Sequence, residues 1–146
     1  MKKLKERTKL KNKHVLILGL AFKPEVDDIR DSLSFKIRKA LLRDHAKVML
    51  HDPFVKNYSG QKLIENIDDA LKKADSIIIA TRHKFYIKEK ERILKNMKPN
   101  AIICDVWNIF ENNKLIFKAN EIMKSKIKSN GHLILTRSKR PVNKRI

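Results

Sequence analysis

The sequence predicts an α/β fold in which one parallel, doubly wound sheet is covered by helices on both faces. Apolar runs of strand length recur along the chain. They are continuous rather than alternating, as is typical of parallel strands buried on both faces. Segments with apolar residues at helical spacing lie between them. The length of 146 residues corresponds to about one domain, so this alternation predicts a single sheet with right-handed crossovers.

About six strands are expected in this Rossmann-like sheet, in the order 3-2-1-4-5-6. The first candidate is the most apolar, and it ends near a single glycine, Gly19. The third candidate is short, and the helix that follows it leads into the fourth candidate strand. The candidate strands are residues 14–20, 47–50, 62–64, 76–80, 101–104 and 132–135.

Helices are predicted between these strands from apolar residues that share one face. The first helix follows Asp31 or Ser32, either of which can cap a helix N-terminus. Residues 67–73 are expected to form the helix before the fourth strand. The other helical faces are Leu33, Ile37, Ala40 and Leu41, then Ile93, Leu94 and Met97, and finally Leu115, Ala119, Ile122 and Met123.

The charge is strongly basic but unevenly distributed. The formal net charge is +19. Residues 1–13 carry seven Lys or Arg and one Glu, and residues 137–146 carry five Lys or Arg and no acid. We therefore divide the chain into a basic N-terminal stub or linker (1–13), a domain (14–136) and a basic C-terminal tail (137–146). Basic tails are usually solvated, so we do not expect a nucleic-acid partner and keep it only as an alternative.

The cysteine content and hydropathy indicate the compartment. Cys104 is the single cysteine, which excludes an internal disulfide and a cysteine metal cluster and fits a reducing environment. No apolar stretch approaches the roughly 20 residues of a membrane span, and no apolar segment of a signal peptide follows the basic start. A cytoplasmic protein without a membrane partner is expected.

The loop after the first strand is the most informative segment. Gly19 is followed by Phe22 and Lys23, and an acidic turn with Arg30 then leads to the first helix. The carboxyl ends of parallel strands and the N-termini of helices collect anionic ligands, so both cations would lie where a phosphate binds. Only one glycine stands where the dinucleotide motif has three. A ligand loop and an ordinary strand-to-helix turn both remain open.

Other candidate residues follow later strands. Asp52 could bind a ribose, although its place before Pro53 favours a turn residue. His83, with Thr81 and Arg82, could line a pocket, but a histidine here is more often a helix-start or surface residue. Trp107 could stack on a base or sugar, or it could be a half-buried packing residue.

The sequence offers no evident catalytic machinery of its own. Cys104 lies in an apolar strand, where a thiol packs as a small apolar group. The spacing of the histidines His14, His45 and His51 does not match a metal site. Neither a Ser-His-Asp arrangement nor a phosphate-binding P-loop is found, so we assign neither catalytic residues nor a metal.

Several of these segments together resemble a known domain. They are residues 19–24, 28–32, 51–53, 74–75 running into 77–81, and Asp105 with Asn108. In this order and spacing they are similar to the C-terminal, nucleotide-sugar-binding domain of the UDP-glucose/GDP-mannose dehydrogenase family. That family contains NAD-dependent enzymes that oxidise a nucleotide sugar at C6 to a uronic acid. The resemblance covers nearly the whole chain.

The resemblance implies roles for particular residues. Phe22 and Lys23 would contact the UDP-sugar, and Trp107 would line the substrate-binding site. Arg30 would reach toward the pyrophosphate of NAD, which another domain mainly holds. Many family members carry arginine at the position of Trp107, so the sugar preference or the anchoring across a dimer is expected to differ.

The resemblance also implies what this chain needs from elsewhere. Segments resembling the family's N-terminal NAD-binding domain and its central region with the reactive cysteine do not occur in these 146 residues. We therefore expect one wall of the cleft of a UDP-glucose or UDP-N-acetylmannosamine type 6-dehydrogenase, inactive alone, with the missing domains or a partner chain as its complement. The alternatives are a stand-alone nucleotide-sugar-binding or assembly module, and a basic nucleic-acid-binding protein.

Overall fold

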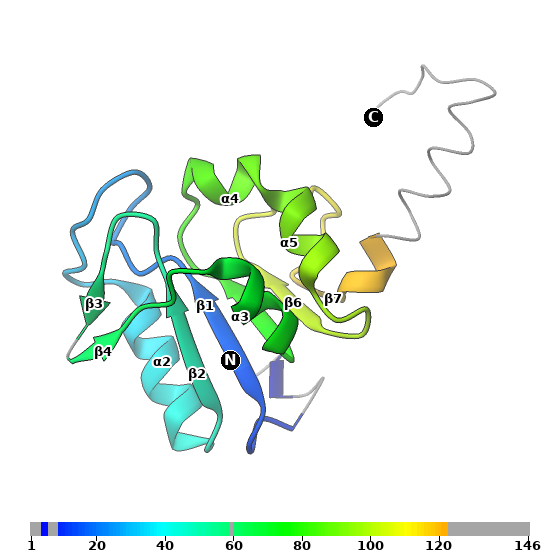
Figure 1. The fold of residues 1–146 in the computed structure, drawn as a ribbon, viewed down its shortest axis with the longest axis horizontal. Coiled ribbons are helices and arrows are strands. Elements are labelled where there is room, and N and C mark those ends of the chain that lie inside the picture. The colour runs from blue at the N-terminus through cyan, green and yellow to red at the C-terminus, as the bar shows by residue number, and fades with distance from the viewer. Residues whose placement is uncertain (1–3, 6–8, 59, 123–146) are drawn as a thin grey trace.

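The main element of the fold is a five-stranded sheet with the order β2-β1-β5-β6-β7. Figure 1 labels β2, β1, β6 and β7 of this sheet. The computed structural model describes residues 4–5, 9–58 and 60–122. The first four strands in this order are parallel, and β7 pairs antiparallel with β6. The predicted α/β class with a predominantly parallel sheet is confirmed. The strands are β1 (His14–Leu18), β2 (Lys47–His51), β5 (Ser76–Ile79), β6 (Ile102–Asp105) and β7 (Ile116–Lys118).

Burial on both faces of the sheet explains why the sequence of the central strand β1 is continuously apolar. Val15 and Ile17 pack into the core on one face of the sheet, and Leu16 and Leu18 pack into the core on the other. These four side chains are fully buried. At about 1.5–3 kcal/mol for each buried aliphatic side chain, β1 contributes strongly to both cores.

Helices cover both faces, as the doubly wound fold requires. Helix α2 (Leu33–Arg43) packs on the face of Val15 and Ile17, where Leu4 and Leu10 are also buried. Helices α3 (Ile67–Lys73), α4 (Lys84–Lys88) and α5 (Lys90–Asn96) lie on the opposite face. In the described part of the chain, the helices are too short or too polar to cross a bilayer.

Local capping sets the starts of two helices. The Ser32 side chain accepts a hydrogen bond from the Ser34 N–H at the start of α2. Asn66 accepts from the N–H groups of Asp68 and Asp69 at the start of α3, and these acidic residues favourably meet the positive end of the helix dipole. The predicted range 67–73 is therefore confirmed.

The predicted neighbours 47–50, 14–20, 76–80 and 101–104 are confirmed in that order, but the predicted third strand was wrong, because residues 62–64 do not extend the main sheet. Strand β4 (Gln61–Lys62) instead pairs antiparallel with β3 (Asn57–Tyr58) in a separate hairpin. Gly60, with φ +79°, supplies the left-handed turn that closes it. One backbone hydrogen bond, from Ile64 N–H to the Leu50 carbonyl, ties the end of this segment to β2.

The predicted helix over Leu115 to Met123 was also wrong in its first part. Residues 116–118 form β7, which covers the edge of β6 and buries Phe117, and helical residues begin only at Ala119. On α2, Leu41 is buried as expected but Leu33 is 55% exposed. The predicted strand 132–135 and Met123 lie outside the described residues.

Gly19 is required where β1 ends. Its φ is +100°, and a Cβ on this residue would lie 2.4 Å from the Cβ of Thr81. The backbone after β1 therefore passes against the end of β5 at a distance that only glycine permits. This contact determines the direction in which the following loop leaves the sheet.

Gly19→Ala is expected to lower the free energy of unfolding by about 3 kcal/mol, because it adds a steric overlap to an unfavourable φ. Gly60→Ala is the control, since φ is +79° there and no atom lies within 4 Å of the added Cβ. This control should cost about 1 kcal/mol. Chemical denaturation followed by circular dichroism measures both values, and equal losses would contradict the proposed close contact.

Candidate functional site

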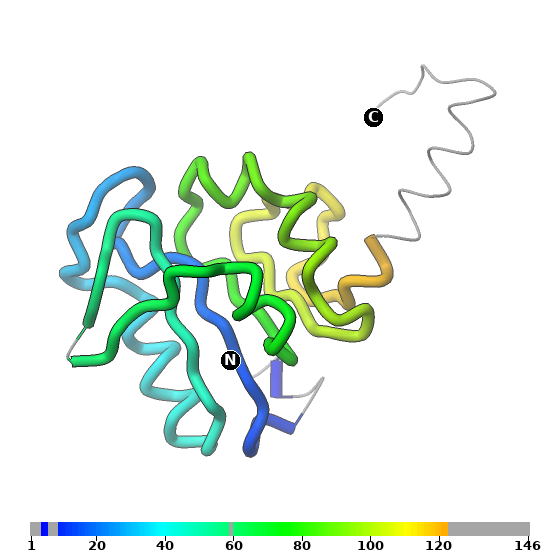
Figure 2. The backbone as a smooth tube through the Cα atoms, in the orientation of Figure 1, coloured from blue at the N-terminus to red at the C-terminus, as the bar shows by residue number. Residues whose placement is uncertain are grey.

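The candidate site lies at the carboxyl ends of β1, β2 and β5. The tube in Figure 2 shows the loop after β1 at the same end of the molecule as the segments after β2 and β5. Strand β1 is followed in sequence by its neighbour β2, and the chain then returns to pair β5 on the other side of β1. Such a switch point is where open α/β sheets bind ligands.

Asp52 joins the first two of these segments. Its buried Oδ2 accepts hydrogen bonds from the N–H groups of Leu20 at 2.7 Å and Ala21 at 3.1 Å. Its Oδ1 accepts from the N–H groups of Phe54 at 2.8 Å and Val55 at 3.2 Å. The second pair is the Asx-type turn that the sequence favoured. With its lone pairs occupied in this way, the carboxylate is not available to ribose hydroxyls.

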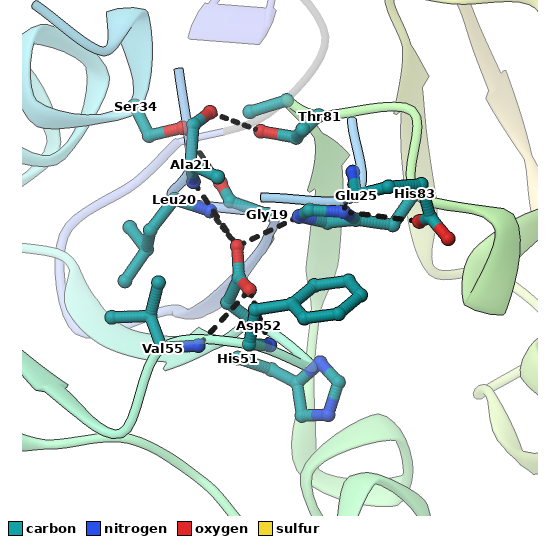
Figure 3. Close-up of polar contacts among 12 residues, drawn as sticks. Gly19, Leu20, Ala21, Glu25, Ser34, His51, Asp52, Val55, Thr81 and His83 are labelled. Carbon is teal, nitrogen blue, oxygen red and sulfur yellow. Dashed lines mark hydrogen bonds and ion pairs between the residues drawn. The ribbon is translucent and has the colours of Figure 1, made fainter. Parts of the chain in front are cut away.

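His83 joins the third segment to the same carboxylate, as Figure 3 shows. Its side chain is fully buried, and Nε2 lies 2.9 Å from Asp52 Oδ2. Its Nδ1 accepts the N–H of Glu25 at 3.0 Å. A backbone N–H can only donate, so this contact makes Nδ1 the acceptor and Nε2–H the donor to Asp52. The Glu25 carboxylate oxygen Oε2 lies 3.5 Å from the same Nδ1.

The interpretation of His83 from sequence was therefore correct in position and wrong in exposure. It precedes α4 at the N-cap position, but it is 0% exposed. Its carboxylate partner Asp52 is 31 residues away in sequence. The one available signal was that both residues follow apolar runs and so lie at the same edge of the sheet.

The protonation of Asp52 reflects two opposed effects. Burial is the largest influence and raises the pKa of this carboxyl. The hydrogen bonds from His83, Leu20 and Phe54 act in the opposite direction, and together they leave its pKa below the usual value. Asp52 is thus held as a buried anion by its donors.

Two hydroxyl groups hold the carbonyls of the loop after β1. Thr81 Oγ1 donates to the Ala21 carbonyl at 2.9 Å, and Ser34 Oγ donates to the Gly19 carbonyl at 2.6 Å. Thr81 lies in the turn that follows β5, and Ser34 lies in the first turn of α2. The backbone from Gly19 to Ala21 is therefore held through both its donors and its acceptors.

His51 and Tyr86 form a second buried polar pair beneath this edge. The His51 Nδ1 lies 2.9 Å from the Tyr86 hydroxyl, which donates to the His51 carbonyl at 3.0 Å. Burial lowers the pKa of His51 to about 4 and raises the pKa of the fully buried Tyr86. Both side chains are neutral at physiological pH.

The sequence-predicted ligand residues are exposed beside this network. Phe22 is 60% exposed, and its N–H donates to the Asp28 carbonyl at 2.6 Å. Lys23 is also exposed. The Arg30 guanidinium makes a two-pronged contact with Asp28, at 3.0 and 2.8 Å. This hydrogen bonding lowers the pKa of Asp28 to about 2, and the Arg30 side chain remains 86% exposed.

Trp107 lies on the loop after β6. Its Nε1–H donates to the Ala80 carbonyl at 3.1 Å, while half of the residue surface remains exposed. Buried Asp105 accepts from the N–H groups of Ile109 and Phe110 at 3.0 and 2.9 Å and so shapes the loop. One edge of the indole is therefore anchored and the rest is accessible, as expected of a half-buried packing residue, and stacking on a base or sugar stays a prediction.

Cys104 and the other possible ligand groups near this edge bear on whether the site holds a nucleophile or a metal ion. Burial raises the pKa of Cys104, which agrees with a packing role rather than a nucleophile. Within the described ranges, no group of three or more His, Cys, Asp or Glu side chains could hold a metal ion.

A cavity of about 890 Å³ lies between the turn after β2 and the β3–β4 hairpin. Its lining includes Pro53, Lys62 and Phe85 but not Phe22, Lys23 or Trp107.

Comparison with known proteins identifies related domains. Residues 16–112 match the family model described as UDP-glucose/GDP-mannose dehydrogenase family, UDP binding domain. A UDP-glucose 6-dehydrogenase of Rhizobium meliloti is 30% identical over 113 residues, which cover 73% of this chain and 25% of that protein. A UDP-glucose 6-dehydrogenase of Rickettsia conorii is 33% identical over 110 residues, which cover 70% of this chain and 26% of that protein.

Solved structures give the same result. An NDP-N-acetyl-D-galactosaminuronic acid dehydrogenase from Methanosarcina mazei has 31% sequence identity and a TM-score of 0.64, over 73% of this chain and 23% of that one. A UDP-D-ManNAc dehydrogenase from Pyrococcus horikoshii has 30% identity and a TM-score of 0.60, over 73% and 24% of the two chains. The chain thus spans about a quarter of the length of these relatives.

The buried His51 predicts a pH dependence of stability. The pKa of this imidazole is about 4 in the folded chain against an ordinary 6.5, so on acidification the unfolded chain binds the proton first. The stability that neutral His51 contributes is present above pH 6.5 and is lost as the pH falls toward 4.

His51→Asn, whose amide can still donate to Tyr86, should flatten the dependence of the unfolding free energy on pH between about 4 and 6.5. Denaturant titrations of both proteins across this range make the comparison. An identical slope for the two proteins would show that His51 is not the responsible group.

Proposed function

Because the chain belongs to the UDP-glucose/GDP-mannose dehydrogenase family, we propose that it is the nucleotide-sugar-binding wall of a UDP-sugar 6-dehydrogenase. The observation that carries this proposal is the geometry of the loop after β1, residues 19–25, which we call the ligand loop. Its backbone is held at Gly19 to Ala21 and again at Glu25, and it exposes an aromatic ring and a cation between these points. A pre-positioned aromatic and ammonium group suits a ligand with both a ring and phosphates.

Lys23 supplies the charge for the anionic part of the ligand. Its exposed ammonium group can approach a phosphate without breaking any buried contact. Exposed Phe22 offers an apolar face next to it for the sugar or base. Trp107 supplies a second aromatic surface, held along one edge by its bond to the Ala80 carbonyl. An indole lacks the charge and the forked donors of arginine, so it favours stacking over a fixed ionic contact.

The described residues at the carboxyl ends of β1 and β2 lack the usual features of a dinucleotide-binding site. The loop after β1 has one glycine, and Asp52, at the position of a ribose-binding acid, is buried and occupied by backbone N–H groups. Arg30 is exposed and could contact the pyrophosphate of a dinucleotide held elsewhere, where it would share its guanidinium with Asp28. NAD therefore belongs to the complete enzyme, and its hydride chemistry lies outside this chain.

We further propose that residues 14–136 are the binding domain, flanked by basic segments 1–13 and 137–146, in a cytoplasmic enzyme. The described residues contain no cysteine other than Cys104, whose thiol is partly buried in a strand. The thioester step of the family therefore requires a cysteine from another domain or chain. This supports inactivity of the isolated chain.

Isothermal titration of the 146-residue chain with UDP tests the binding proposal. We expect saturable binding that Lys23→Ala weakens by about tenfold, because a hydrogen bond to a charged group is lost. Lys73→Ala removes an exposed lysine at the C-terminus of α3 and should leave the affinity unchanged. Equal affinities for the wild type and Lys23→Ala would remove Lys23 from the site.

Two further assays separate this proposal from its alternatives. Reduction of NAD by the isolated chain with UDP-glucose or UDP-N-acetylmannosamine would contradict the expected inactivity. Salt-dependent binding of random RNA without binding of UDP would favour the basic nucleic-acid-binding alternative.

A further inference from the structure

We propose that His83 is a positioning residue for the ligand loop: its ring links the buried Asp52 carboxylate to the Glu25 N–H and thereby places Phe22 and Lys23. This assignment deepens the function proposed above, and its consequence for nucleotide binding rests on that function. The mechanical part, which is the ordering of the loop through His83, rests on the geometry alone.

The loop is held on both sides of its exposed residues. On one side, Ala21 donates its N–H to Asp52 and accepts from Thr81 at its carbonyl. On the other side, Glu25 donates its N–H to His83 Nδ1. The residues between these anchors are Phe22, Lys23 and Pro24, and the ring of Pro24 restricts its own φ. Few backbone torsions are therefore left free.

Glu25 is bound to the turn after β5 through a second contact. Its Oε2 accepts the N–H of Lys84, the first residue of α4, at 2.9 Å. Its φ is +63°, a left-handed conformation that a residue other than glycine adopts at a cost. Two hydrogen bonds at this residue, through His83 and Lys84, offset that cost and hold the loop in an otherwise unfavourable bend.

The surroundings of His83 keep its ring in one orientation. The ring centroid lies 5.2 Å from that of Phe54 and 5.8 Å from that of Tyr86, and the side chain is fully buried. A half-turn of the ring would replace both nitrogens by carbons and break the bonds to Asp52 and Glu25. Packing and hydrogen bonding thus select the same orientation and the same tautomer.

The two nitrogens of His83 have separable roles, and two substitutions distinguish them. His83→Gln places an amide N–H near the position of Nε2, so it can retain the bond to Asp52 and lose the one to Glu25. His83→Asn places a carbonyl oxygen near the position of Nδ1, so it can retain the acceptor for Glu25 and lose the donor to Asp52. A purely structural role would make the two variants behave alike.

Amide hydrogen exchange of the full chain, followed by NMR, provides the test. In His83→Gln the Glu25 amide should exchange roughly tenfold faster relative to the amides of the sheet. In His83→Asn its relative protection should be retained, while global stability falls because a buried carboxylate loses a donor. Arg82→Ala changes the exposed neighbour in the same turn and should leave the Glu25 amide unaffected.

Nitrogen chemical shifts of the wild-type ring test the proposal even if a variant fails to fold. At neutral pH, Nε2 should be protonated and Nδ1 unprotonated. A protonated Nδ1, or equal exchange of the Glu25 amide in the two His83 variants, would overturn the proposal.

Titration with UDP then tests the link to function. His83→Gln should weaken UDP binding more than His83→Asn does. If the exchange pattern appears but the wild-type chain does not bind UDP, the proposed function fails and the positioning of the loop stands. If the wild type binds UDP and the two variants bind it equally, the positioning does not serve that site and this proposal fails.

Discussion

The arrangement of the whole sheet edge depends on one buried carboxylate, Asp52. It follows β2, receives the N–H groups at the end of β1, and is bound by His83 after β5. A buried anion is costly unless donors surround it, and here backbone N–H groups and an imidazole supply them. The ends of three strands therefore satisfy one charge, and none of them can shift without leaving it partly unpaired.

This constraint changes what the strand edge can bind. In dinucleotide-binding sheets an acid near the end of the second strand binds the ribose. Here the acid at the corresponding place faces inward and holds the protein's own loop. The loop is thus rigid at its base and presents Phe22 and Lys23 outward, which suits one wall of a cleft better than a complete nucleotide pocket. The proposed wall, which another domain would complete, is compatible with the coverage of about a quarter of the related dehydrogenases.

Tertiary pairing also explains the errors in the predicted fold. Residues 62–64 have strand-like composition, but the turn at Gly60 closes a local hairpin before they can join the sheet. The apolar spacing after Leu115 resembles a helix, but an uncovered edge of β6 offers backbone partners to residues 116–118. A short apolar segment can satisfy either pattern, and the neighbouring element decides between them.

The sequence by itself determined the α/β class, the positions of β1, β2, β5, β6, α2 and α3, and the order of the four parallel strands. It also indicated that Phe22, Lys23 and Arg30 follow a strand edge. Periodicity and capping are local, so they can be detected without knowing which strands become neighbours. Only the tertiary structure decided the separate β3–β4 hairpin, the antiparallel β7 and the pairing of His83 with Asp52. These two residues are 31 positions apart, and their contact exists because the chain crosses β1 between them. Because of this crossover, Asp52 and His83 lie in contact and together hold the ligand loop.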